Sequence, residues 1–223
     1  MSKVMSRPPA SAPPPAAMDA DAGSWTLRVR KTWDRVLPMD HLLPHRQPYY
    51  VGSWVYVFGV VTIAALVWVV VSGVVLSFMG PQWWHDTGVG HFFNSLHFWS
   101  VQMFFIFMVL HLWGQYFMAG WRDGRALTWM IGVVIFGISI LTAFTGYLSQ
   151  LNFDSQYIGI SAKDAMDGAG IGAFFNVLNF GQMYGLHVML LPITVTFIVV
   201  VHIVMVRSRG VVKPIGPEGG AAK

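Results

Sequence analysis

Four long apolar runs without a charged residue constrain this chain more than any other feature. They cover residues 54–79, 92–118, 127–149 and 182–206, and none contains Asp, Glu, Lys or Arg. A helix needs about 20 apolar residues to cross the hydrocarbon core of a bilayer. The sequence therefore predicts an all-α membrane protein built as a bundle of four transmembrane helices, and 223 residues leave no room for a separate soluble domain.

The flanking segments differ from the runs in composition. Residues 1–23 are rich in Pro and Ala, which predicts a disordered tail. Residues 24–37 alternate Trp, Leu and Val with Arg and Lys, a pattern that favours an amphipathic helix on the membrane surface, with an ordinary linker as the alternative. The folded domain is then expected over residues 24–213, with a short tail at 214–223.

The basic residues indicate how the chain is oriented. Of the 14 Lys and Arg residues, seven precede the first run, two lie between the second and third, and four follow the last. Because short cytoplasmic segments carry an excess of Lys and Arg, both termini are predicted to be cytoplasmic in a multi-pass protein of the inner or plasma membrane. The positive charge is thus explained by topology rather than by nucleic-acid binding. The chain has no cysteine, which excludes disulfides, thiolate metal sites and thioether-linked heme.

Two of the runs each carry a pair of histidines at almost the same spacing. His97 and His111 are 14 residues apart, and His187 and His202 are 15 apart. Fourteen residues rise about 21 Å along a helix and complete almost four turns, so both side chains leave the same helix face. The two helices together therefore offer an imidazole pair at two matched depths.

An imidazole pair at each depth is the axial ligand set of a six-coordinate heme iron. Zinc fits less well, because a structural zinc ion gathers its ligands around one point, whereas these pairs are a helix length apart. A histidine in a transmembrane helix can also do no more than hydrogen-bond a neighbouring carbonyl, although ionisable groups at this depth are usually functional. A proton path in a heme-free channel or transporter is a third interpretation.

The other two runs carry glycines at the same interval. Gly59 and Gly73 are 14 residues apart, and so are Gly132 and Gly146. Glycine serves ordinary helix packing in membranes. At this spacing, however, we expect each glycine to lie at the depth of a ligand pair, where a flat macrocycle can approach the helix.

Two local expectations concern the chain around the last run. Pro192 follows His187 by five residues, and a kink or loosened turn there can absorb the extra residue of the 15-residue interval. In the connection before this run, the apolar segment from Gly172 to Phe180 predicts a short surface helix.

Taken together, these features resemble cytochrome b, and more narrowly its short, split form, cytochrome b6. Besides the histidine and glycine pairs, the resemblance rests on LTW before the third run, TGY at its end, LHxxxLP from His187 to Pro192, and the terminal MVRSRG. It covers about residues 24–213. It implies two hemes b, with quinol as the substrate.

The resemblance also implies roles for individual residues. His97 and His187 would ligate an outer heme of lower potential, and His111 and His202 an inner heme of higher potential. The four glycines would face the hemes, and three further residues would lie near the inner heme or an inner quinone site. The full set of cofactor-contacting residues is Gly59, Gly73, Gly132, Gly146, Trp129, Arg125 and Arg207.

The implied function is electron transfer across the membrane during quinol oxidation, which contributes to proton translocation. One electron would pass to a Rieske iron–sulfur protein and the other would cross both hemes inward. Other implied partners are a cytochrome c-type subunit, a separate three- or four-helix cytochrome b subunit carrying a PEWY motif, and a second copy of this chain. The chain would be the electron-transfer core of a quinol–cytochrome c, or similar, oxidoreductase. No catalytic acid or base is identified, and Asp154 and Tyr147 are only candidates.

Several positions depart from the family pattern. Val57 stands where the split form has a cysteine that holds an extra heme, so no covalent heme c is expected. Asn94 replaces the arginine usually found three residues before the outer ligand, and Phe98 follows that ligand. After TGY the chain reads LSQLNFDSQ instead of a Pro-Trp type turn. This segment keeps open a second hypothesis, a diheme membrane anchor that couples the quinone pool to a different redox enzyme.

Overall fold

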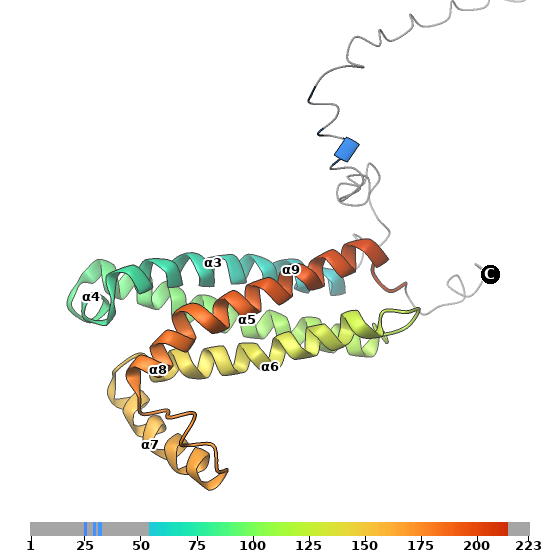
Figure 1. Ribbon diagram of the computed structural model, residues 1–223. Helices are drawn as coiled ribbons and strands as arrows, with labels where there is room; N and C mark the ends of the chain where they lie inside the picture. Colours follow the sequence, from blue (N-terminus) through green and yellow to red (C-terminus); the bar gives the residue numbers. More distant parts are fainter. Residues whose placement is uncertain (1–24, 26–28, 30, 33–53, 214–223) are drawn as a thin grey trace, which may run out of the picture. The chain divides into compact units, whose positions relative to one another are not determined.

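The structure is a computed structural model that describes Trp25, Val29, Lys31, Thr32 and residues 54–213 (Figure 1). The chain forms two units, Met1–His45 and Arg46–Lys223. The four described residues of the first unit are helical and exposed, at positions where the amphipathic surface helix is predicted. The rest of that helix and the predicted tails at 1–23 and 214–223 lie outside the described residues.

All the regular secondary structure of residues 54–213 is helical. A 3-10 turn, η2 (Trp54–Tyr56), leads into α3, and a π-helical turn, η3, precedes α9. The elements that follow η2 are, in order, α3 (Val57–Met79), α4 (Pro81–Asp86), α5 (Gly88–Phe117), α6 (Ala126–Leu148), α7 (Phe153–Gly168), α8 (Phe180–Gly185), η3 (Leu186–Leu190) and α9 (Leu191–Arg209).

Four helices of the described chain are long and apolar enough to cross a membrane. They are Val57–Met79, Gly88–Phe117, Ala126–Leu148 and Phe180–Arg209, the last made of α8, η3 and α9 in continuous succession. Each overlaps one of the four predicted runs, so the predicted four-helix membrane architecture is confirmed.

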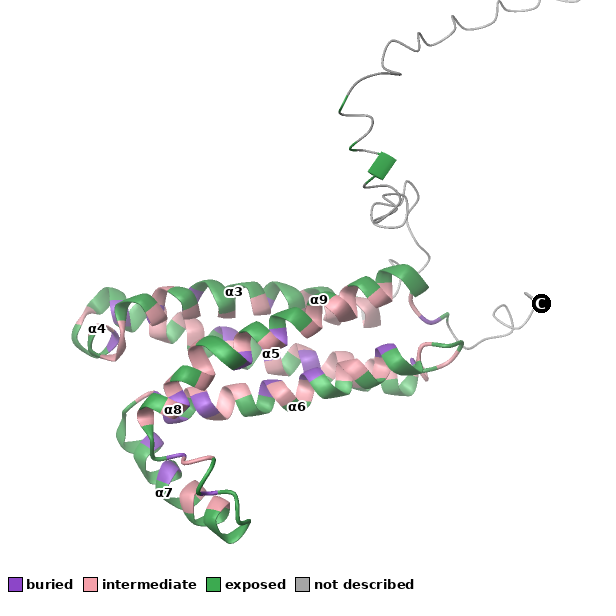
Figure 2. Ribbon diagram, in the orientation of Figure 1, coloured by how far each residue is buried: buried purple, intermediate pink, exposed green. Residues whose placement is uncertain are grey.

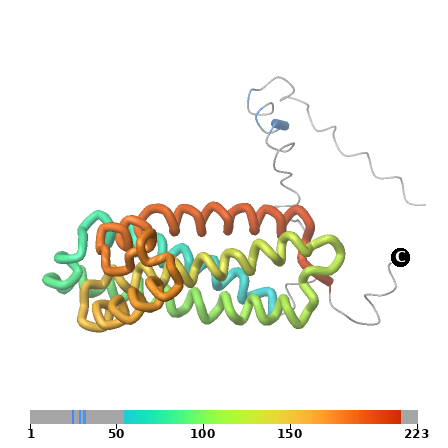
Figure 3. Tube along the Cα trace, turned by 60° about the horizontal axis from the view of Figure 1, so that its bottom comes forward, coloured from blue at the N-terminus to red at the C-terminus, as the bar shows by residue number. Residues whose placement is uncertain are grey.

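The spans form two antiparallel hairpins. We call α3 with α5 the first hairpin and α6 with α9 the second, because the closest helix packing is within these pairs. Figure 3 shows the four long helices running alongside one another. Helix α3 begins and α9 finishes at one end of the bundle, the terminal end; α4 and α7 lie at the other, the connection end (Figure 1).

Apolar side chains fill the middle of the bundle and also cover its outside. Ala65, Phe104, Met108 and Ile135 form a buried cluster that joins α3, α5 and α6. Large apolar residues such as Trp68 and Phe197 are exposed on the outward faces, and Figure 2 shows exposed positions along every long helix. Large continuous apolar surfaces of this kind are rare in soluble monomers and match the apolar interior of a bilayer.

The connection end differs from expectation in one place. The segment from Gly172 to Phe180 does not form the predicted surface helix, and its residues are turns until α8 begins. The surface helix is instead α7, which Asn152 caps by accepting a hydrogen bond from the Ser155 amide at 2.8 Å. The capping residue was a usable signal, since Asn followed by an acidic residue in the first turn is typical of a helix start.

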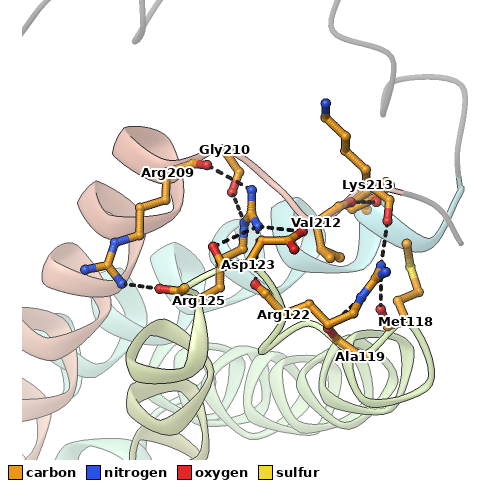
Figure 4. A network of polar contacts seen from close by, with 11 residues as sticks. Met118, Ala119, Arg122, Asp123, Arg125, Arg209, Gly210, Val212 and Lys213 are labelled. Carbon is orange, nitrogen blue, oxygen red and sulfur yellow. Dashed lines mark hydrogen bonds and ion pairs between the residues drawn. The ribbon is translucent and has the colours of Figure 1, made fainter. Parts of the chain in front are cut away.

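At the terminal end, arginine side chains bind the segment that follows α9 (Figure 4). Arg125 donates to the carbonyls of Gly210 at 3.0 Å and Arg209 at 3.2 Å, and Arg122 donates to that of Lys213 at 2.8 Å. Arg209 in turn donates to the Gly124 carbonyl at 3.1 Å. These bonds hold residues 209–213, which we call the strap, against the α5–α6 connection.

A fifth bond ties the strap to the start of the first hairpin. The Tyr56 hydroxyl donates to the Val212 carbonyl at 2.6 Å, and the Val212 side chain is only 1% exposed. The strap therefore links η2, the α5–α6 connection and the end of α9.

We expect Tyr56→Phe to lower the stability of the protein, because it leaves the Val212 carbonyl without this donor. A lost hydrogen bond of this kind costs about 1 kcal/mol. Thermal unfolding of the purified protein in detergent measures the effect. Tyr116→Phe is the control, since Tyr116 is more than half exposed at the same end of the bundle. Equal melting temperatures for the two variants would contradict the prediction.

Candidate functional site

The four histidines lie in two layers, each with one ring from each hairpin. His97 on α5 and His187 in η3 form the 97/187 layer, towards the connection end. His111 on α5 and His202 on α9 form the 111/202 layer, towards the terminal end, where the two rings lie near each other. The structure thus brings together both histidine pairs that the sequence predicts.

The two rings of the 97/187 layer are close together and nearly perpendicular. The ring centroids of His97 and His187 are 6.1 Å apart and the ring planes are 86° from parallel. A metal–imidazole bond of about 2.0 Å, plus about 1.2 Å from nitrogen to ring centre, would put two rings that bind one metal from opposite sides about 6.4 Å apart. The spacing therefore fits a single metal ion between the rings. Among residues 54–213 no cluster of three or more potential metal ligands occurs, so each layer offers two protein ligands.

The first hairpin places a glycine of α3 directly against each histidine of α5. An ideal Cβ added to Gly73 would lie 3.1 Å from Cε1 of His97. One added to Gly59 would lie 3.1 Å from Cε1 of His111 and 3.2 Å from its Nδ1. These distances are tighter than ordinary van der Waals contact, so a side chain at either position would push the ring away.

The second hairpin repeats the arrangement. A Cβ on Gly132 would lie 3.4 Å from Cε1 of His202, and one on Gly146 would overlap the His187 ring itself. All four predicted glycines therefore lie at the depth of a histidine layer. They make room for the imidazole rings, which is a more specific role than the approach of a macrocycle expected from the sequence.

The glycines also expose hydrogen-bond acceptors. Nδ1 of His97 lies 3.0 Å from the Val69 carbonyl, and Nδ1 of His187 lies 2.8 Å from the Thr142 carbonyl. Each carbonyl belongs to the residue four positions before the cradling glycine, so no Cβ covers its free lone pair. A histidine that donates from Nδ1 presents Nε2 as the metal-binding nitrogen, and such a bond fixes the tautomer and the ring plane.

The 111/202 layer lacks these bonds. The Nδ1 atoms of His111 and His202 are buried and have no hydrogen-bond partner among the described residues. The Thr128 carbonyl, four residues before Gly132, lies near His202, but Nδ1 of His202 does not form a hydrogen bond to it. Buried polar atoms without partners are rare in native structures.

A cavity of about 480 Å³ opens between the hairpins at the 97/187 layer. Its lining comes from all four spans and is mostly apolar, with both histidine rings exposed to it. Ser139, which lies seven residues from both Gly132 and Gly146, also lines the cavity, and its buried hydroxyl has no partner among the described residues. The cavity suits a large apolar group held by two imidazoles.

The π-helical turn η3 explains the longer interval on the last span. It covers Leu186–Leu190, contains His187 and ends two residues before Pro192. A π turn holds one more residue than an α turn at the same position, and such turns are frequent at functional sites. The expected loosened turn is therefore present, and it lets a 15-residue interval match the 14-residue interval of α5.

The remaining predicted residues lie at the terminal end. Trp129 on α6 packs its ring against Trp121 at 5.5 Å, and its buried Nε1 has no partner among the described residues. Arg125 is engaged with the strap carbonyls described above, and Arg207 is exposed at the end of α9. Asp154 is exposed in the first turn of α7, and Tyr147 is 39% exposed.

Sequence reasoning missed the acceptor carbonyls of Val69 and Thr142, and it also missed Ser72, whose hydroxyl lies 3.0 Å from Nδ1 of His97. A backbone carbonyl carries no side-chain signal. Its position could still be inferred, because it precedes each cradling glycine by one helical turn.

Comparison with known proteins identifies the fold family. The family model described as Cytochrome b/b6/petB matches residues 46–210. The chain is 28% identical to a cytochrome bc complex cytochrome b subunit of Chlorobaculum thiosulfatiphilum, over the whole chain and 58% of that relative. It is 29% identical to cytochrome b6 of Chlamydomonas reinhardtii, over 58% of this chain and 66% of the relative.

Two further similarities agree with this result. The cytochrome b subunit of menaquinol:cytochrome c reductase from Bacillus subtilis is 24% identical over 79% of this chain and 90% of its own length. A chain of a solved structure, a hyperthermophilic respiratory Complex III, superposes with a TM-score of 0.65 at 21% identity, over 88% of this chain and 56% of its own. The chain thus spans little more than half the length of some relatives.

The family model covers most of the chain, and the four spans, paired histidines and cradling glycines agree with it. The chain belongs to the cytochrome b/b6 family, an integral membrane family that binds heme b, and its four spans are those of a b6-like N-terminal part.

Proposed function

We propose that this chain holds two hemes b, one at each histidine layer, and carries electrons across the membrane during quinol oxidation in a bc-type complex. The observation that carries the proposal is the perpendicular His97–His187 ring pair, 6.1 Å between centroids, with a glycine against each ring. The second layer repeats the same glycine and histidine positions about 21 Å further along the helices.

Each layer fits the group that the proposal assigns to it. At the 97/187 layer, His97 and His187 would hold the heme iron and the cavity between the hairpins would take the rest of the group. At the 111/202 layer, His111 and His202 would be the ligands, and Nε1 of Trp129, which has no partner among residues 54–213, is free to donate to a bound group. A heme at each layer supplies a one-electron redox couple.

The chain's own residues bind, orient and shield. The carbonyls of Val69 and Thr142 hold the Nδ1 protons of the first layer, which leaves Nε2 of each ring free to coordinate. Apolar side chains such as Phe104 and Met108 fill the space between the layers and exclude water. Moving a charge against a membrane potential costs about 2.3 kcal/mol per 100 mV, so a higher potential at the inner layer would assist inward transfer.

We place the terminal end on the cytoplasmic side of the plasma membrane. Arg122, Arg125, Arg207 and Arg209 lie at this end of the bundle, whereas the connection end carries a single Lys163. With this topology the 97/187 layer is the outer one and the 111/202 layer the inner one. Arg125 and Arg207 would then raise the potential of the inner heme.

The partners follow from the same proposal. A Rieske iron–sulfur protein would take one electron from quinol, a cytochrome c-type subunit would receive it, and a second cytochrome b subunit with PEWY would complete the quinol site. We also expect the chain to form a homodimer. No covalent heme c is expected, because Val57 replaces the cysteine that would hold it. Proton translocation would result from quinol oxidation at the outer face.

A second candidate is a diheme anchor for a different redox enzyme. It is favoured by α7, which occupies the segment after TGY where the family usually has a Pro-Trp type turn. Purification of the native complex discriminates the two. Copurification of a Rieske protein and a PEWY-bearing subunit would support quinol oxidation with bifurcation, whereas a molybdenum or hydrogenase subunit would support the anchor.

Heme content tests the histidine assignment directly. We expect wild-type protein to show two hemes b per chain by pyridine hemochrome assay and reduced-minus-oxidised spectra. His97→Ala and His111→Ala should each lower the content to one, because each removes an axial ligand from one layer only. The two variants should lose spectrally different hemes. A wild type without heme, or variants that keep two, would refute the proposal.

The glycine cradle gives a finer test. We expect Gly146→Ala to lower heme content towards one per chain, because the added Cβ would overlap the His187 ring. Gly137→Ala on the same helix is the matched control, since a Cβ there meets nothing within 4 Å. The control should keep both hemes. If Gly146→Ala keeps two hemes with unchanged spectra, the position of the His187 ring does not depend on this glycine.

A further inference from the structure

Ser72 occupies a special place beside the outer histidine. It directly precedes Gly73 on α3 and is 0% exposed. Its hydroxyl oxygen lies 3.0 Å from Nδ1 of His97, 2.6 Å from the Trp68 carbonyl and 3.2 Å from the Val69 carbonyl. Nδ1 of His97 therefore has two oxygens at the same distance, since the Val69 carbonyl is also 3.0 Å away.

The single hydroxyl proton decides the direction of these bonds. The short contact to Trp68 marks that carbonyl as its acceptor. The lone pairs of the Ser72 oxygen are then free to accept from the Nδ1–H group of His97. This gives a chain of donors that runs from His97 to Ser72 and on to the Trp68 carbonyl, and such chains polarise their members.

We propose that Ser72 is a positioning residue that tunes the outer heme through His97. The inference rests on the proposed function, in which Nε2 of His97 coordinates iron. A second acceptor on Nδ1–H draws that proton away from the ring, so the ring donates more electron density through Nε2. More donation stabilises the oxidised iron, and hydrogen bonding around the ligands is one of the means by which a protein sets a heme potential.

The other cradling sites provide an internal comparison. Thr145 precedes Gly146 and is also fully buried, but its hydroxyl donates to the carbonyls of Thr142 at 2.9 Å and Leu141 at 3.1 Å and makes no bond to a ring. Phe58 and Ile131 precede the glycines of the other layer and have no hydroxyl. Of these four residues, Ser72 alone hydrogen-bonds an imidazole.

The test is a redox titration of both hemes in purified Ser72→Ala. Loss of the second acceptor should raise the potential of the 97/187 heme, with a three- to tenfold change in its reduction equilibrium. At 59 mV per tenfold for one electron, this is about 30 to 60 mV. The potential of the 111/202 heme should stay the same. The heme that His97→Ala loses identifies which potential belongs to which layer.

Two further variants separate tuning from a general packing effect. Thr145→Val removes a hydroxyl of equal burial that touches only the carbonyls, and it should not raise the potential. Ser72→Thr keeps the hydroxyl and should restore the wild-type potential. If Ser72→Ala loses the 97/187 heme altogether while Ser72→Thr keeps it, the hydroxyl is likewise required at His97.

Opposite outcomes would overturn the proposal. An unchanged potential in Ser72→Ala, or an equal rise in Thr145→Val, would show that Ser72 does not act through the ring. These results would appear in protein that still carries two hemes, so they leave the proposed function intact. A wild type that binds no heme would overturn both proposals.

Discussion

An imidazole that reaches towards the centre of a four-helix bundle must lie almost flush against the backbone of the neighbouring helix. Each of the four histidines lies against a glycine, and an added Cβ would crowd the ring at Gly59, Gly73 and Gly146 and would only touch it at Gly132. The glycine spacing therefore matches the histidine spacing, and each hairpin pairs one glycine helix with one histidine helix. The closest packing is within the hairpins, and the cavity opens between them.

The same glycines create a difference between the two layers. A missing Cβ uncovers the carbonyl one turn earlier, and the 97/187 rings use these carbonyls while the 111/202 rings do not. The two layers thus have the same arrangement of histidines and glycines but different hydrogen bonds to the histidine rings. Ligand hydrogen bonds and nearby charge both influence a heme potential, so in the proposed diheme function this difference would add to one that the arginines at the terminal end would produce.

Much of this arrangement could be predicted from the sequence because membrane spans are long and their patterns are simple. The four spans, the two histidine layers and the depth of the glycines all followed from apolar length and from intervals such as His97 to His111. The surface helix was predicted in the wrong segment, because apolar content is high from Gly172 to Phe180 whereas the start of α7 is marked only by the Asn152 cap. The contacts of the backbone carbonyls, and the second acceptor offered by Ser72, depend on how the helices face one another. They produce no repeating pattern in the sequence from which they could be predicted. The strap could not be predicted either, since Arg122 and Arg125 bind its backbone carbonyls rather than acidic side chains.

The order of the spans is a glycine helix followed by a histidine helix, and then the same again. Both hairpins start at the terminal end and run in the same direction, as parallel internal repeats do in some membrane proteins. One hairpin contributes one ring to each layer and one glycine behind each ring. A single two-helix peptide with these four positions would therefore complete both layers by pairing with its own copy as a symmetric dimer. When two such units are joined in one chain, the two halves can differ in sequence and structure. The π turn and α7 are two such differences, since they occur only in the second half of the described chain.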